Sequence, residues 1–153
     1  MQSRLQRTHS QARAALVGNR GLSKQQARAA LALSNGRDVA AISAIAAALA
    51  GDTAQAVRLA SDRNQRFPQD TVVQFDYLPM IRAASILGGS DASKDAGEAI
   101  QALAKAEPYE LGGASEAVEF FLYPVYLRGE AYLAARQGAA AAGEFEKILN
   151  HPG

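Results

Sequence analysis

Residues 128–149 read RGEAYLAARQGAAAAGEFEKIL, and this stretch decides the fold. Gly129 and Ala141 stand twelve residues apart, and Gly153 follows at the same distance. A small residue on each of two helices lets their backbones approach closely, and a glycine or proline ends the second helix. Phe145 lies four residues after Ala141, which is the spacing of one helical face. The stretch therefore predicts two helices paired as an antiparallel hairpin.

The same spacing occurs twice more in the chain, which indicates an internal repeat. The matching triplets are Ala44, Ala56, Pro68 and Ala84, Ala96, Pro108. Large apolar residues fill the remaining contacts of the second and third units. The first unit is degenerate, because Arg63 stands where the other two units have Leu103 and Ile148. We therefore expect three hairpins, with tight or imperfect packing in the first.

Two prolines occupy equivalent places, since Pro79 and Pro124 each lie five residues before the small residue of their unit. A proline either opens a helix in its first turn or kinks a longer one. Val72, Phe75 and Leu78 already show helical spacing before Pro79. We therefore favour extended or kinked helices at both prolines.

These patterns predict an all-α fold of antiparallel hairpins stacked as a right-handed solenoid with a concave face. Expected N-caps are Asp52 or Thr53, Asp70 or Thr71, and Asp91. The expected helices are 4–17, 23–34, 38–50, 53–66, 71–88, 92–106, 115–136 and 139–149. Turns are expected at 18–21, 35–36, 51–52, 88–90 and at Gly138. The single domain, 1–153, would comprise a basic N-terminal hairpin, 1–37, and repeat units 38–69, 70–110 and 115–153.

Composition narrows the class of protein further. Hydrophobic residues make up 48% of the chain, but many are alanine, and the chain has no cysteine. Disulfides, thiolate zinc sites and cysteine nucleophiles are thereby excluded. The longest weakly polar run, 39–50, is too short to span a bilayer, and residues 1–20 do not resemble a secretory signal. We expect no membrane insertion and a soluble chain, either cytoplasmic or the extracytoplasmic portion of a membrane-anchored parent.

Charge is unevenly distributed along the chain. Seven Lys and Arg residues and no acid occur up to Arg37, whereas acids dominate from Asp38 onward. A polyanion-binding head is one interpretation, and an Arg-studded solvent face is the other. The second is favoured because no aromatic residue lies between Met1 and Arg37 to stack on bases. Nucleic acid therefore ranks low among the expected partners.

The third unit resembles a tetratricopeptide repeat through Arg128–Leu133, Ala141, Phe145–Leu149 and Pro152. More narrowly, segments 66–79 and 108–112 together with 123–153 resemble the repeat regions of bacterial signalling proteins. There such repeats follow a serine/threonine kinase or a winged-helix domain. The resemblance implies a sensor or interaction region, and we expect the chain to be part of a larger array.

Catalysis is not expected. The chain has no glycine-rich phosphate loop, no His-Arg-Asp and no Asp-Phe-Gly. Its only histidines, His9 and His151, lie at opposite ends. The acidic stretch Glu107, Glu110, Glu116 and Glu119 is interpreted as a solvated loop and helix start. We therefore predict a protein that is not an enzyme and that has no metal site and no cofactor.

The best binding candidates belong to an aromatic cluster of Phe120, Phe121, Tyr123 and Tyr126, with Tyr77 one unit earlier. In the resembled family the first helix of each hairpin lines the groove. The partner-binding residues that the resemblance implies are Tyr77, Arg82, Tyr123, Tyr126 and Glu130. Capture of a terminal carboxylate is not expected, because Ala41 and Ile45 occupy the places of the clamping residues.

The sequence leaves three non-catalytic functions open. The first is a protein–protein interaction scaffold whose groove receives a peptide or a partner domain. The second is an intramolecular spacer or homo-oligomerisation module, in which a symmetric copy would cover an apolar end or edge. The third is a nucleic-acid-associated helper that uses the basic head, with binding that salt weakens.

Overall fold

The computed structural model describes residues 20–110 and 122–151, and within these residues the chain is helical and contains no strand. The predicted helix 4–17 and residues 115–121 of another lie outside them. The helices are α2 (Arg20–Leu33), α3 (Arg37–Leu49), α4 (Thr53–Arg66), α5 (Leu78–Leu87), α6 (Ala92–Leu103), α8 (Tyr123–Ala134) and α9 (Gly138–Leu149). A π-helical turn, η1 (Val73–Tyr77), precedes α5, and a 3-10 turn, η2 (Glu107–Tyr109), follows α6. The all-α prediction is confirmed.

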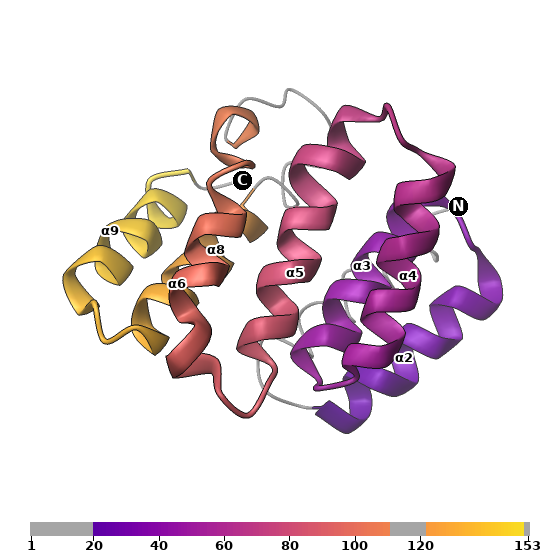
Figure 1. The fold of residues 1–153 in the computed structure, drawn as a ribbon, viewed down its shortest axis with the longest axis horizontal. Coiled ribbons are helices and arrows are strands. Elements are labelled where there is room, and N and C mark those ends of the chain that lie inside the picture. The colour runs from indigo at the N-terminus through magenta and orange to yellow at the C-terminus, as the bar shows by residue number, and fades with distance from the viewer. Residues whose placement is uncertain (1–19, 111–121, 152–153) are drawn as a thin grey trace.

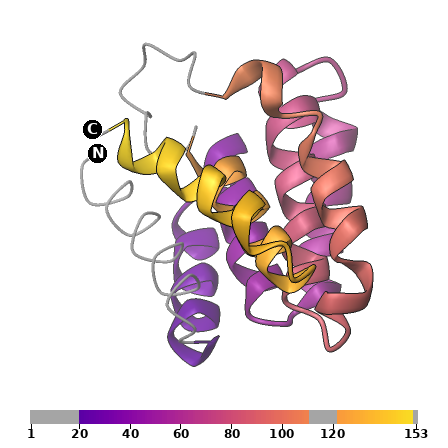
Figure 2. The ribbon, with the colours of Figure 1, turned by 90° about the vertical axis from the view of Figure 1, so that its left-hand side faces the viewer.

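The helices pack as adjacent antiparallel pairs, α3 with α4, α5 with α6 and α8 with α9. Each pair also packs on the one before it: α5 lies against α3 and α4, and α8 lies against α5 and α6. Figure 1 shows the pairs following one another along the long axis of the molecule. In the view turned by 90°, Figure 2 shows α9, in yellow, in front of the other helices and crossing them at an angle. The pairing therefore follows the order of the predicted hairpins.

The small residues of the repeat lie where helices touch, as predicted. Gly129 is buried, and a Cβ atom there would lie 2.5 Å from a ring carbon of Phe145. The five alanines of the three pairs are almost inaccessible, at 1% exposure or less: Ala44, Ala56, Ala84, Ala96 and Ala141. Apolar residues between the pairs complete the core, among them Met80, Leu103 and Leu127.

Two of the three expected N-caps are confirmed. The Asp52 carboxylate accepts a hydrogen bond from the backbone N–H of Gln55 at 3.2 Å, and that of Asp70 accepts one from Val73 at 3.0 Å. These bonds satisfy donors that a helix start leaves unpaired. Asp91 stands at the N-cap of α6 but makes no such bond.

The helix runs through Pro79, as favoured for that proline, but it does so by way of a π turn. The N–H of Leu78 bonds the carbonyl of Val73, five residues back, so the turn holds one extra residue. Proline has no N–H and its ring crowds the carbonyl four residues back, and an irregular turn relieves both problems. The extra residue also shifts the buried face. Phe75 is 43% exposed, whereas Asp76 is only 6% exposed.

Three boundaries differ from the predictions by three residues or more. Arg20 and Gly21 belong to α2, so the predicted turn at 18–21 is wrong at these residues; a glycine weakens a helix by about 1 kcal/mol without forbidding it. Helix α6 ends at Leu103, before the predicted end at residue 106. Helix α8 begins at Tyr123, so Pro124 lies in its first turn, the place where a missing N–H costs least.

Arg63 shows how the first repeat unit packs although it lacks the apolar residue found at this position in the other two units. Its side chain is fully buried in α4, at the position of Leu103 in α6. The guanidinium donates to the backbone carbonyls of Asn35 and Gly36, each at 3.3 Å, and also bonds Asp62. Both carbonyls lie in the connection between α2 and α3. The arginine thus ties α4 to that connection, where an apolar residue could not bond the carbonyls.

Candidate functional site

The candidate site is a groove between α4 and α5 with a volume of about 470 Å³. Each helix contributes four residues at the spacing i, i+3, i+4, i+7, which places them on one helical face. The lining residues are Val57, Ala60, Ser61 and Asn64 on α4, and Leu78, Ile81, Arg82 and Ser85 on α5. We call this feature the α4–α5 groove.

The floor and one wall of the groove are apolar. Ile81 is buried, Leu78 and Ala60 are half-buried against the core, and Val57 is 58% exposed. An exposed valine beside buried apolar residues is available to a ligand without any rearrangement of the core. The Ser85 hydroxyl donates a hydrogen bond to the carbonyl of Ile81 at 2.8 Å, so Ser85 adds little polarity to the groove. The groove therefore suits an apolar side chain.

Arg82 supplies a positive charge at the rim. Its guanidinium lies 3.4 Å from the Glu98 carboxylate, and both side chains are more than half exposed. An ion pair in this setting contributes about 0–1 kcal/mol, so a ligand carboxylate could replace Glu98 at small cost. On the opposite wall the Asn64 side-chain oxygen accepts from Gln74 at 3.0 Å.

The structure brings only one predicted binding residue, Arg82, into this groove. Tyr77 is buried, and its hydroxyl donates to the Asp38 carboxylate at 3.0 Å. Burial, followed by the charge of Asp38, raises the pKa of the Tyr77 hydroxyl well above its ordinary value. Tyr77 therefore holds two helices together and does not lie on the surface.

The other three predicted residues lie on α8. Tyr123 is half-buried against the core. The Tyr126 ring lies 5.9 Å from that of Phe145 on α9, and burial, followed by the charge of Glu130 and a hydrogen bond to it, raises the Tyr126 pKa to about 12. Phe120 and Phe121 lie outside the described residues. Binding by the α8 residues stays a prediction.

A second cluster of charged residues surrounds the buried Arg128 of α8. Its guanidinium bonds both oxygens of Glu110 at 2.7 and 2.6 Å, and Glu144 of α9 at 2.8 Å. Lys147 in turn bonds Glu144 at 2.7 Å. Burial alone would raise the Glu144 pKa, but Arg128 and Lys147 hold it below the usual value. The charges are internally compensated, so this cluster stabilises the fold and offers no open coordination position.

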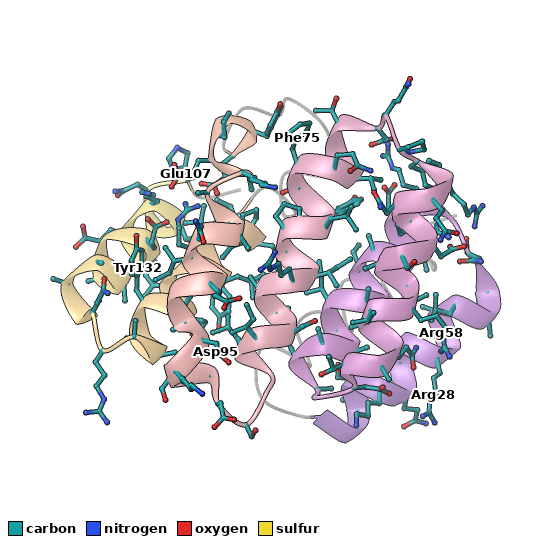
Figure 3. All side chains as sticks on the ribbon, viewed as in Figure 1. Arg28, Arg58, Phe75, Asp95, Glu107 and Tyr132 are labelled. Carbon is teal, nitrogen blue, oxygen red and sulfur yellow. The ribbon has the colours of Figure 1, made fainter. Side chains whose placement is uncertain are left out.

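The predicted solvated acidic stretch is wrong at Glu110. The Glu110 side chain is only 7% exposed because Arg128 draws it against α8. Glu107 is exposed, in agreement with the prediction, and Figure 3 places it at the same end of the helices as Phe75. Glu116 and Glu119 lie outside the described residues.

Beside Glu110 lies Asp76 of the π turn. Burial, followed by the negative charge of Glu110, raises the pKa of Asp76 to about 7. No group of three or more His, Cys, Asp or Glu residues in the described part could hold a metal ion. His151 is exposed and its ring nitrogen lies 2.8 Å from the Lys147 carbonyl, while His9 lies outside the described residues.

A wider hollow of about 740 Å³ lies where α3 and α5 end. Apart from Lys24, glycines and other short residues line it, including Gly51, Thr53, Gly88 and Ser90. It offers no apolar side chain larger than alanine, so the α4–α5 groove is the better candidate for binding.

The α4 wall of the groove was missed by sequence reasoning, which placed binding on the first helix of each hairpin. The available signal was Val57, an apolar residue next to the small contact residue Ala56 and hence off the buried face. No protein-family model, curated protein or solved structure matches this chain. Within the described residues no helix combines the length and apolar character needed to cross a membrane.

Proposed function

We propose that the protein is a non-catalytic protein–protein interaction scaffold whose α4–α5 groove receives an apolar side chain of a partner peptide. The observation that carries the proposal is the groove itself, in which the exposed Val57 adjoins the buried Ile81 and the half-buried Leu78. Peptide anchors bind in this way, with one apolar side chain buried and neighbouring polar groups fixing its orientation.

The charge at the rim of the α4–α5 groove limits the peptide sequences that would bind there. Arg82 is the charged residue of the lining, and among the described residues it pairs with the exposed Glu98 alone. A peptide with an acidic residue close to its apolar anchor would gain a charge-assisted hydrogen bond from Arg82. An apolar anchor flanked by Asp or Glu is therefore the expected motif.

We also propose that the paired helices form a tetratricopeptide-like right-handed solenoid. Support comes from the repeated packing, in which each new pair rests on both helices of the pair before it. Such an array presents binding surfaces without a catalytic centre, which fits a sensor or interaction region of a bacterial signalling protein.

The test is selection from a displayed peptide library against the whole chain. Peptides should be enriched for an apolar anchor with an adjacent acid, and they should bind Val57→Asp at least tenfold more weakly. Arg82→Glu should weaken the acid-containing peptides selectively. The matched control is Leu33→Asp, which changes another exposed apolar residue on α2 and should leave binding intact. Selected peptides that bind wild type and Val57→Asp equally would refute the groove as the site.

A further inference from the structure

The last helical pair differs from the other two in how its second helix is covered. Helix α4 packs against α3 and also against α5, and α6 packs against α5 and also against α8. Among the described elements, α9 packs closely on α8 alone. Within the described residues, one side of α9 therefore lacks the second helix that α4 and α6 each have.

The repeat register identifies the residues on that side. The first and third pairs superimpose in sequence on Ala56 and Ala141. The residues of α4 that face α5 include Val57, Ala60 and Asn64, which line the shared groove. Their equivalents on α9 are Ala142, Phe145 and Leu149. The face is more apolar here than on α4, since Leu149 replaces Asn64 and Phe145 replaces Ala60.

Exposure agrees with this assignment. Leu149 is 78% exposed, the largest value among the exposed large apolar residues of the described part. Ala142 is exposed, and Phe145 is half-buried because one side of its ring meets Gly129 and Tyr126. An exposed leucine alone would need no explanation, but here it continues a row of apolar positions.

Helix α8 contributes to the same side. On α3 Ala48 is fully buried, and its carbonyl oxygen lies against Gly88 at the C-terminal end of α5, where it would be 2.0 Å from a Cβ atom. The equivalent of Ala48 on α8 is Leu133, which is 50% exposed. Leu133 lies near the turn that joins α8 to α9, and Leu149 ends α9, so the stripe runs the length of the pair.

We propose that the face formed by Leu133, Ala142, Phe145 and Leu149 is a docking surface for an amphipathic helix of a protein partner. The partner helix would pack on α8 and α9 as α5 packs on α3 and α4. The stacking of helices would thus continue across the interface. This face is separate from the α4–α5 groove and does not depend on the function proposed for that groove.

The packing of α5 on α4 also indicates which residue types the partner helix should carry. Helix α5 presents Leu78 and Ile81 to α4, with Arg82 directly following at the rim. On α9 the exposed Glu146 replaces Ser61 of α4. A partner helix with apolar residues at i and i+3 and a basic residue at i+4 would thus pair its charge with Glu146.

The test uses a labelled peptide copying Thr71–Gly88, held helical by a side-chain staple on its exposed face and checked by circular dichroism. Fluorescence anisotropy with the whole chain should show saturable binding. Leu149→Glu should weaken this binding at least tenfold, and Glu146→Lys should weaken it severalfold. Leu33→Glu, the control at an exposed leucine of α2, should leave it unchanged, as should the groove variant Val57→Asp.

Three outcomes would overturn the proposal. They are no saturable binding of the helical peptide, binding that Leu149→Glu leaves intact, and a concentration-dependent dimer that Leu149→Glu dissolves. The last, measured by light scattering, would assign the face to a second copy of the chain. Loss of binding in Val57→Asp with no effect of Leu149→Glu would place the peptide in the α4–α5 groove.

Discussion

Two arginines, Arg63 and Arg128, are buried in the described part of the chain, and they bond different partners. Arg63 bonds the neutral carbonyls of Asn35 and Gly36, and its one carboxylate, Asp62, is exposed to solvent. Arg128 is held by the carboxylates of Glu110 and Glu144, both nearly buried. The same residue type therefore joins neighbouring elements through dipoles at one site and through full charges at the other.

The difference indicates at which site the loss of the arginine would cost more unfolding free energy. A carbonyl that loses its donor remains neutral, whereas a buried carboxylate that loses its partner must either stay charged in an apolar site or take up a proton, and both cost free energy. The surroundings sharpen the contrast. Arg63 bonds the carbonyl of Gly36, two residues before the Asp38 that accepts from Tyr77, whereas the charge of Glu110 in the Arg128 site helps raise the pKa of Asp76.

The largest effect is expected for Arg128→Leu. The substitution leaves Glu110 and Glu144 buried without their main partner, which should cost about 3–5 kcal/mol of unfolding free energy. Urea unfolding at pH 7 measures it. Arg58→Leu, at an exposed arginine of α4 labelled in Figure 3, should cost less than about 0.5 kcal/mol. A cost for Arg128→Leu no larger than that of Arg58→Leu would contradict the comparison.

Between about pH 4 and pH 8, a pH-dependent effect is expected beside the Arg128 site and not at the Arg63 site. Because the folded pKa of Asp76 is raised to about 7 and its ordinary value is 3.8, the folded state holds a proton that the unfolded state has lost. Stability should therefore fall as pH rises from about 4 to about 7 and stay low above that.

Asp76→Asn tests this directly. It should raise Tm by several degrees at pH 8 and flatten the decline between pH 4 and 7, with little gain at pH 4. Melting curves at a series of pH values measure it, with the exposed Glu146→Gln as the control that keeps the decline. An Asp76→Asn variant with the wild-type pH profile would show that Asp76 is not the group responsible.

Arg63→Leu places at α4 the residue that α6 has at the same position. The leucine keeps the site apolar but leaves the carbonyls of Asn35 and Gly36 without their donor. The expected cost is about 1–3 kcal/mol, smaller than for Arg128→Leu. The loss should also be nearly constant from pH 5 to 9, because its main acceptors do not titrate. A strong pH dependence of the loss would remove the distinction between the two sites.

The smallest effect is expected for Tyr77→Phe, which removes the hydroxyl that donates to Asp38. Loss of one hydrogen bond to a carboxylate that keeps its contact with Arg37 should cost about 1 kcal/mol. Differential scanning calorimetry resolves a change of this size. Tyr109→Phe serves as the control, since the Tyr109 ring packs on Phe75 and is 40% exposed. Equal changes in the two variants would show that the Asp38 bond adds no stability.

The helical order could be predicted from the sequence because it rests on local spacing. Ala56 and Ala141 mark helix contacts, and Asp52 and Asp70 mark helix starts, all within a few residues of what they determine. Which face of the helix before Pro79 is buried could not be predicted. Apolar spacing placed Phe75 on the buried side, and the π turn exchanged it with Asp76.

The candidate site was predictable only in part, because a groove between two helices depends on distant residues. Arg82 was predicted on α5, but Val57 and Asn64 come from α4 and face it through packing. Arg128 and Glu110 are likewise eighteen residues apart, and no local pattern links them. Long-range charge pairs of this kind are decided by how the pairs of helices stack.

The π turn before Pro79 has a consequence for how this helix can change during evolution. Deleting one residue from Val73–Tyr77 would restore a regular helical turn, but it would also bring the Pro79 ring against the carbonyl four residues back. Replacing Pro79 alone would remove that obstacle and leave the extra residue in place. A deletion within this turn is therefore expected to be tolerated only together with replacement of Pro79.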